Sequence, residues 1–125
     1  MSKSKADVIN YRKKRALETI EEAKVLTQID SWAGVINRLY YACFYIVSAL
    51  LFKNGLISKT HTGTKTLFFN EFIKTGIVDN KWSEHYQRLF NLRTKGDYED
   101  LVFFEATEVK PLITKTENFF NRSKL

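Results

Sequence analysis

Residues 32–53, WAGVINRLYYACFYIVSALLFK, contain the longest uncharged apolar run of the chain, Leu39 to Phe52. Apolar side chains three and four residues apart make a broad helical stripe: Trp32, Val35, Ile36, Leu39, Cys43, Ile46, Val47, Leu50 and Leu51. The opposite face is also apolar, with Tyr40, Tyr41, Phe44, Tyr45 and Phe52. A helix that is apolar nearly all round lies either in the centre of a bundle or in a subunit interface. The uncharged run, at 14 residues, is too short to span a bilayer, so we expect a buried core helix.

The rest of the chain predicts further helices around this one. The expected ranges are about 7–28 with Asp7 as the N-cap, 64–74, a helix from 79 or 83 to 96, and 105–122. The central helix is expected to begin after Asp30-Ser31, which supply a turn and an N-cap, and to end at Asn54-Gly55, a pair suited to a left-handed C-cap. Because the connections are short, the predicted fold is an all-α, up-and-down bundle of four to five helices in a single domain, residues 1–125.

Some local details stay open at this stage. In the first helix, the residues expected to face the core are Val8, Tyr11, Leu17, Ile20, Ala23, Leu26 and Ile29. The last helix either begins near Val109 or is kinked at Pro111. Residues 101–104, LVFF, have strand-forming side chains but no second strand to pair with, so we expect a loop or a short extended segment.

Composition excludes several classes of protein. One proline and five glycines are too few for the many tight turns of an all-β sandwich or barrel. The single cysteine, Cys43, excludes an internal disulfide and a cysteine-based zinc cluster, and two distant histidines make a metal site unexpected. We therefore expect no metal and no cofactor. The N-terminal segment lacks the apolar centre of a secretory signal, and we expect a cytoplasmic protein.

The positive charge is concentrated at the N-terminus. Residues 1–15 carry six Lys or Arg residues against one Asp, a net charge of +5, whereas the whole chain has +6. Residues 1–6 are expected to form a flexible basic arm. The whole basic segment, residues 1–15, is either a solubilising tail with an exposed first helical turn or a source of weak, sequence-independent RNA binding that fades with salt.

Arg38 adjoins the apolar run and needs either water or a carboxylate as a partner. Arg93 and Asp97 stand four residues apart and could pair within one helix. Alternatively, Asp97 pairs with Arg38 across two helices, which is the prediction made here. Arg38, Tyr41 and Tyr45 share a helical face, and the simplest role for these polar groups is to tie the bundle together.

The two histidines and the cysteine are the remaining candidates for chemistry. His61 lies in a loop rich in Ser, Thr and Gly before a helix, where it is either an acid–base group or an ordinary capping residue. His85, next to Glu84, is expected at an exposed polar position. Cys43 is expected to be a buried structural thiol.

Three stretches together resemble one known family. Residues 37–44, NRLYYACF, are similar to the Arg-x-Tyr-Tyr-Ala-x-Phe signature of HEPN domains. Residues 58–63, SKTHTG, and 91–98, NLRTKGDY, resemble the Ser-Lys-x-His-x-Gly and Leu-Arg-x-x-x-Asp-Tyr elements of small, stand-alone, uncharacterised HEPN proteins. The order is the same, and the flanking helices extend the resemblance over nearly the whole chain.

The resemblance implies a helical bundle, often dimeric, that associates with nucleotides or RNA. Many members are metal-independent ribonucleases, often toxins paired with a small nucleotidyltransferase antitoxin. Their catalytic signature is an arginine followed, after four to six residues, by a histidine. This chain lacks the signature: residues 54–56 and 78–80 contain no arginine ahead of His61 or His85, and no histidine follows Arg93.

The resemblance therefore implies a polar pocket rather than a catalytic motif. Its candidate ligand-binding residues are Arg38, Tyr41, His61, Arg93, Asp97 and Tyr98. The first hypothesis is a non-catalytic HEPN-like module that binds a nucleotide or RNA-related ligand, a nucleotidyltransferase partner, or both. The second is a metal-independent ribonuclease toxin that uses His61 with Arg38 or Arg93, and the third is a pure protein-interaction scaffold.

We also expect a homodimer. The central helix carries more apolar surface than one side of a small bundle buries, and large apolar patches mark interfaces. Light scattering at micromolar concentration measures the mass directly, and a monomer mass would count against this expectation.

Overall fold

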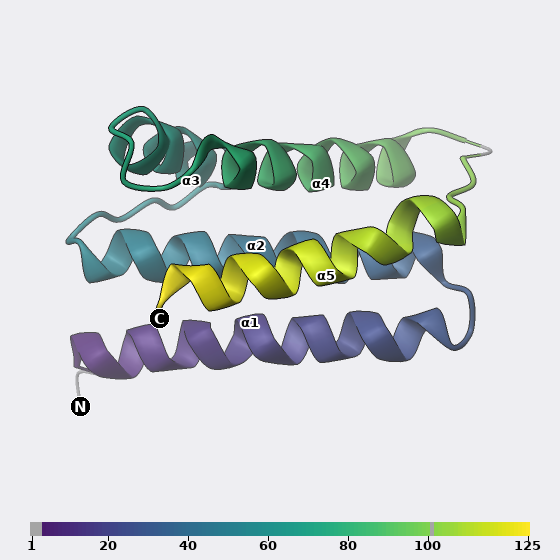
Figure 1. The fold of residues 1–125 in the computed structure, drawn as a ribbon, viewed down its shortest axis with the longest axis horizontal. Helices are drawn as coiled ribbons and strands as arrows, with labels where there is room; N and C mark the ends of the chain where they lie inside the picture. Colours follow the sequence, from purple (N-terminus) through teal and green to yellow (C-terminus); the bar gives the residue numbers. More distant parts are fainter. Residues whose placement is uncertain (1–3, 101) are drawn as a thin grey trace.

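The computed structural model describes residues 4–100 and 102–125 and confirms an all-α bundle. The elements are α1 (Lys5–Thr27), α2 (Trp32–Lys53), α3 (His61–Phe68), the π-helical turn η1 (Phe69–Ile73), α4 (Asn80–Tyr98) and α5 (Ala106–Ser123). Figure 1 shows α1, α2 and α4 stacked in that order with α5 running along α2, while α3 crosses the bundle and is seen nearly end-on. The described residues contain no β-strand.

The central helix of the bundle is α2, which contacts α1, α3, α4 and α5. Eleven of its residues are buried, from Val35 to Leu51. By length and composition α2 is also the one helix in the described part of the chain that could cross a membrane, but most of its apolar stretch is enclosed by its neighbours. Of the two alternatives for this helix, the centre of a bundle is the one that the structure shows.

The first helix begins earlier than the sequence predicts. Ser4, not Asp7, is the N-cap of α1, and the two side chains form a capping box in which each accepts a hydrogen bond from the other's backbone N–H. Of the expected flexible arm, residues 5 and 6 are therefore helical, and residues 1–3 lie outside the described residues. Helix α3 also begins before the predicted residue 64, at His61.

Small side chains, rather than the largest apolar ones, bring α1 against α2. The buried residues of α1 are Ala16, Thr19, Ile20 and Ala23. Tyr11, Leu17 and Ile29, predicted to face the core, are exposed. Alanine and threonine allow two backbones to approach closely, so the α1–α2 packing is the most extensive in the bundle. The prediction from apolar spacing is confirmed for Ile20 and Ala23, but it missed Ala16 and Thr19.

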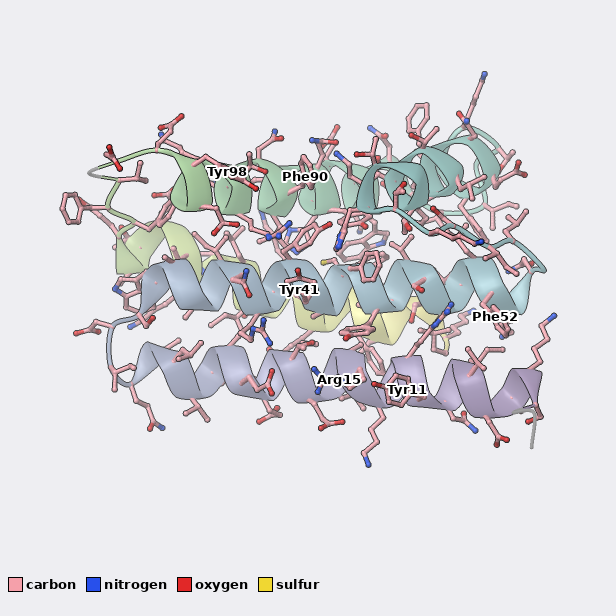
Figure 2. The ribbon with its side chains drawn as sticks, turned by 180° about the vertical axis from the view of Figure 1, so that it is seen from behind. Tyr11, Arg15, Tyr41, Phe52, Phe90 and Tyr98 are labelled. Carbon is pink, nitrogen blue, oxygen red and sulfur yellow. The ribbon has the colours of Figure 1, made fainter. Side chains whose placement is uncertain are left out.

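Arginines from α1 cover the outer aromatic side chains of α2. The Arg12 guanidinium lies 5.0 Å from the centre of the Phe52 ring, and that of Arg15 lies 5.4 Å from the Tyr45 ring. Arg12 also donates a hydrogen bond of 3.0 Å to the carbonyl of Ser48. Figure 2 shows Arg15 on α1 and Phe52 on α2. Two of the N-terminal cations are thus part of the fold.

The C-terminal part of the bundle excludes a start of the last helix near Val109. Helix α5 begins at Ala106, so Pro111 lies inside it, on an exposed face. Residues 102–105 form no regular element, as expected, while Leu101 lies outside the described residues. Helix α4 continues through Gly96, where a β-carbon would approach the Phe104 ring to 3.1 Å.

His85 is buried, with 6% of its surface exposed, so the prediction of an exposed position is wrong. Its Nε2 lies 2.8 Å from the Oγ1 of Thr116 on α5, and Thr116 donates its own proton to the carbonyl of Leu112 at 2.8 Å. The packing of α5 therefore encloses the imidazole and satisfies one of its nitrogens. Burial, followed by the charges of Lys115 and Arg88, lowers the pKa of His85 to about 4.

This buried imidazole makes stability depend on pH. Folded His85 stays neutral down to about pH 4, whereas an unfolded histidine binds a proton near pH 6.5, so the unfolded state holds more protons between these values. We expect the free energy of unfolding to fall by roughly 2–4 kcal/mol as the pH is lowered through this window. Urea unfolding at a series of pH values measures the effect. The His85→Gln variant is the control, and an unchanged pH dependence in this variant would contradict the assignment.

Candidate functional site

The N-terminus of α3 places His61 at the surface of α2. Thr60 is the N-cap and accepts a hydrogen bond from the Gly63 backbone N–H at 2.9 Å, while Ser58 donates to the Thr60 carbonyl at 3.1 Å. A β-carbon at Gly63 would come within 2.6 Å of the Ser58 hydroxyl oxygen, so a larger residue would displace the hydroxyl that forms this turn. His61 is the first residue of the helix and is half-buried.

Three aromatic residues of α2 surround His61. The Tyr40 hydroxyl oxygen lies 2.6 Å from His61 Nδ1. The imidazole stacks on Phe44, with 4.5 Å between ring centres, and meets Tyr41 edge-on at 5.8 Å. Tyr40 is fully buried, whereas Tyr41 and Phe44 are half-buried. The histidine is therefore held by one polar contact from the core and two aromatic contacts near the surface.

Arg93 reaches the same cluster from α4. Its guanidinium lies 4.9 Å from the Tyr40 ring centre and 5.3 Å from that of Tyr41, and it donates a 3.5 Å hydrogen bond to the Tyr41 hydroxyl. Its Nε lies 3.5 Å from Asp97 Oδ2 in an ion pair without hydrogen-bond geometry. His61 and Arg93, 32 positions apart in sequence, thus meet on the same two tyrosines.

Arg38 lies at the edge of this cluster but does not pair with Asp97, so that prediction is wrong. Its guanidinium is 3.3 Å from Glu22 on α1, donates to Asn37 at 2.7 Å, and lies 5.4 Å from the Tyr41 ring centre. Asp97 instead pairs with Arg93 one helical turn away, because both residues lie on the same face of α4. Tyr41 therefore has two arginines within about 5.4 Å of its ring centre.

The electrostatics of the cluster keep its two central groups neutral. Burial, and then the positive charge of Arg93, lowers the pKa of His61. Burial raises the pKa of Tyr40 to about 12, against the opposing effect of Arg93. A phenol is the stronger donor and an imidazole nitrogen the stronger acceptor, so we assign the contact as Tyr40 O–H donating to Nδ1. His61 then carries its proton on Nε2, where it can donate to a ligand.

The site differs from the predicted residue set in several places. The structure brings together Tyr41, His61 and Arg93, with Arg38 and Asp97 at the edges. Tyr98 is 83% exposed, and no contact joins it to His61 or Tyr41 among the described residues. Sequence reasoning missed the polar role of Tyr40, because a tyrosine on an apolar helical face gives no sign that its hydroxyl reaches a distant histidine. Cys43 is a buried thiol, as predicted, and burial raises its pKa to about 12.

The Arg93→Gln variant tests the electrostatic link between the two halves of the site. Removing this charge should raise the pKa of His61, because the guanidinium opposes protonation of the imidazole. NMR titration of the His61 ring protons measures the shift. The Arg38→Gln variant is a matched control, since Arg38 is paired with Glu22, and should leave the pKa of His61 nearly unchanged. Equal shifts in both variants would show that the link is not specific to Arg93.

Comparison with known proteins identifies the family. Residues 9–125 match the HEPN domain. A UPF0332 protein of Thermotoga maritima is 42% identical over 117 residues, which cover 94% of this chain and 89% of the relative. A protein of Methanocaldococcus jannaschii named "Putative toxin MJ0142" is 30% identical over 125 residues, covering 94% of this chain and 85% of the relative. A second protein of that organism, named "Putative toxin MJ0605", is 30% identical over 109 residues, covering 87% and 81% of the two chains.

The match to the domain begins at residue 9, within the N-terminal part of α1, and continues to the last residue. It includes every side chain of the cluster around His61. The chain belongs to the HEPN domain family.

Proposed function

We propose that this protein is a toxin-like HEPN protein that binds a single-stranded RNA segment or a nucleotide on the face formed by Tyr41, Phe44, His61 and Arg93. The observation that carries the proposal is the neutral His61, oriented by Tyr40 and placed beside Arg93. The toxin names of two relatives support a toxin-like role, and the family resemblance favours RNA or a nucleotide as the ligand. We further propose that the protein acts in the cytoplasm.

The face offers each kind of contact that an RNA strand needs. Bases stack on aromatic side chains, and Tyr41 and Phe44 are half-buried, with ring surface still open to solvent. Arg93 offers guanidinium N–H groups to a phosphate, and the Nε2–H of His61 adds a neutral donor. Lys65 Nζ, 3.4 Å from the Phe90 ring centre, adds a further cation at the edge of the same face. Figure 2 shows Tyr41 on α2 and Phe90 on the neighbouring α4.

RNA cleavage is the second candidate, because His61 meets an arginine in space even though the sequence lacks the family's local motif. In such a reaction the 2′-hydroxyl would attack the adjacent phosphorus, its proton passing to His61. The bond to the 5′-oxygen would break, leaving a 2′,3′-cyclic phosphate and a 5′-hydroxyl that takes up a proton. Arg93 would stabilise the charge on phosphorus. This role requires a lone pair on Nε2, and the assigned direction of the Tyr40 hydrogen bond places a proton there, which favours binding without cleavage.

Two partners complete the proposal. The family resemblance favours a nucleotidyltransferase antitoxin, and a second copy of the chain would form a homodimer. The central position of α2 removes part of the original reason for a dimer, since its neighbours already bury most of its apolar surface. Half-buried Tyr45 and Phe52, each beneath an arginine of α1, remain as apolar surface that a partner could cover.

We expect the Arg93→Gln variant to weaken binding of a fluorescent single-stranded RNA by about tenfold, because it removes a charge-assisted phosphate contact. The substitution should also reduce the slope of log Kd against the logarithm of the salt concentration by about one. Fluorescence anisotropy across a salt series measures both quantities. Arg122→Gln, an exposed arginine on α5 outside this face, is the matched control. Affinity that falls equally in both variants would move RNA binding away from the site.

The contribution of the N-terminal lysines is tested by substitution. Deleting residues 1–15 would remove nearly half of α1, so the Lys5→Gln, Lys13→Gln and Lys14→Gln triple variant replaces a truncation. If the basic segment supplies most of the affinity, the triple variant loses most of the binding while Arg93→Gln retains it.

Cleavage is tested with RNA in the presence of a chelator. We expect no product above background from the wild-type protein. A 2′,3′-cyclic phosphate product that disappears with His61→Ala, and is absent from a substrate with a single 2′-deoxy residue at the cleaved position, would overturn the non-catalytic proposal and establish the ribonuclease.

A further inference from the structure

A groove between α4 and α5 holds a second cluster of polar groups that the site around His61 does not use. It encloses about 450 Å3, and its principal lining residues are Lys81, Glu84, His85 and Arg88 of α4 with Lys115 and Asn118 of α5. The size lies within the range of small-molecule sites. Phe90 and Arg93 lie on a different stripe of α4, which packs toward α2.

The charge of this groove is positive. Among residues 4–100 and 102–125, Lys81, Arg88 and Lys115 have no carboxylate within 4.0 Å. Glu84 is the one acid among the lining residues, and its carboxylate accepts a hydrogen bond from Asn80 at 3.0 Å. Three cations and one acid leave a net positive charge, which favours an anionic ligand.

His85 adds a chemical requirement to this charge. Its Nε2–H is directed to Thr116, because the Thr116 hydroxyl proton is donated to Leu112. The other nitrogen, Nδ1, then carries a lone pair and has no hydrogen-bond partner among the described residues. Nδ1 is also not sealed from solvent, since the fully buried side-chain atoms without a partner in residues 4–100 and 102–125 are Tyr86 Oη and Arg93 Nε. An imidazole that is 6% exposed thus presents an acceptor to a groove lined with cations.

We propose that this groove is a binding site for a protonated phosphate group, held by Lys81, Arg88 and Lys115, with its P–OH donating a hydrogen bond to Nδ1 of His85. Inorganic phosphate satisfies both requirements at neutral pH, because HPO4²⁻ carries negative charge and one proton. Sulfate has similar size and charge but no proton. An internal phosphodiester of RNA has no P–OH either, which separates this site from the proposed RNA-binding face.

Two sources of the same chemistry are compatible with the groove: free phosphate and the terminal phosphate monoester of a nucleotide. A monoester loses its second proton near pH 6, so it retains a P–OH mainly below that value. Its affinity should therefore rise between pH 7.5 and pH 6, while His85 stays neutral over this range. The other charged groups that face the site are Lys81, Glu84 and Arg88 on α4 and Lys115 on α5.

The primary test compares inorganic phosphate with sulfate on the wild-type protein by isothermal titration calorimetry at pH 7 and constant ionic strength. We expect phosphate to bind about tenfold more tightly, because sulfate would leave the His85 acceptor unsatisfied. In ¹⁵N NMR, phosphate should shift the Nδ1 resonance of His85 and leave the His61 resonances unchanged. The proposal would be overturned by equal affinities for the two anions or by an NMR response confined to His61. It would also be overturned if phosphate did not bind at concentrations on the order of 10 mM.

Charge variants locate the site, and a nucleotide identifies the source. Lys115→Gln should weaken phosphate binding by about tenfold. Lys110→Gln removes the same charge from α5 outside the groove and should have little effect. Equal losses in both variants would place binding elsewhere. Adenosine 5′-monophosphate, titrated at pH 6 and pH 7.5, should bind more tightly than phosphate if a nucleotide is the ligand and more weakly if the groove is made for the free anion.

Discussion

The bundle depends on the enclosure of α2. This helix is apolar on nearly every side, so no single neighbour can remove it from water, and α1, α3, α4 and α5 all pack on it. Burial of the apolar surface of α2 on all sides therefore determines where the other helices lie. It also explains why α1 presents alanine and threonine to α2, since small residues allow the backbone to approach a face that is already filled by large side chains.

The candidate site is a direct consequence of that enclosure. Two adjacent tyrosines on α2 have different surroundings: Tyr40 is fully buried, whereas Tyr41 is half-buried and close to two arginines. Because α3 and α4 both pack on this part of α2, the first residue of one and a late residue of the other converge on the tyrosine pair. The burial that keeps Tyr40 protonated also makes it a donor that orients His61.

The two histidines show how burial assigns different chemistry to one residue type. Both have lowered pKa values and are neutral at physiological pH. Tyr40 donates to Nδ1 of His61, which leaves the N–H of the imidazole on Nε2. Thr116 accepts from Nε2 of His85, which leaves a lone pair toward the α4–α5 groove. The His61 site is thus suited to a ligand that accepts a hydrogen bond. The His85 groove is suited to a ligand that donates one.

The sequence alone determined the all-α class, the boundaries of α2 and the approximate number of helices, because these follow from local periodicity and capping. Its three short motifs also indicated the HEPN family and five of the groups in or beside the site. Only the tertiary structure decided which polar groups meet: Arg38 pairs with Glu22 rather than Asp97, Tyr40 reaches His61, and His85 is covered by α5. A local pattern specifies the face of a helix on which a side chain lies. The partner across that face depends on how far each helix is shifted and rotated when the whole core packs, and no stretch of sequence contains that information by itself.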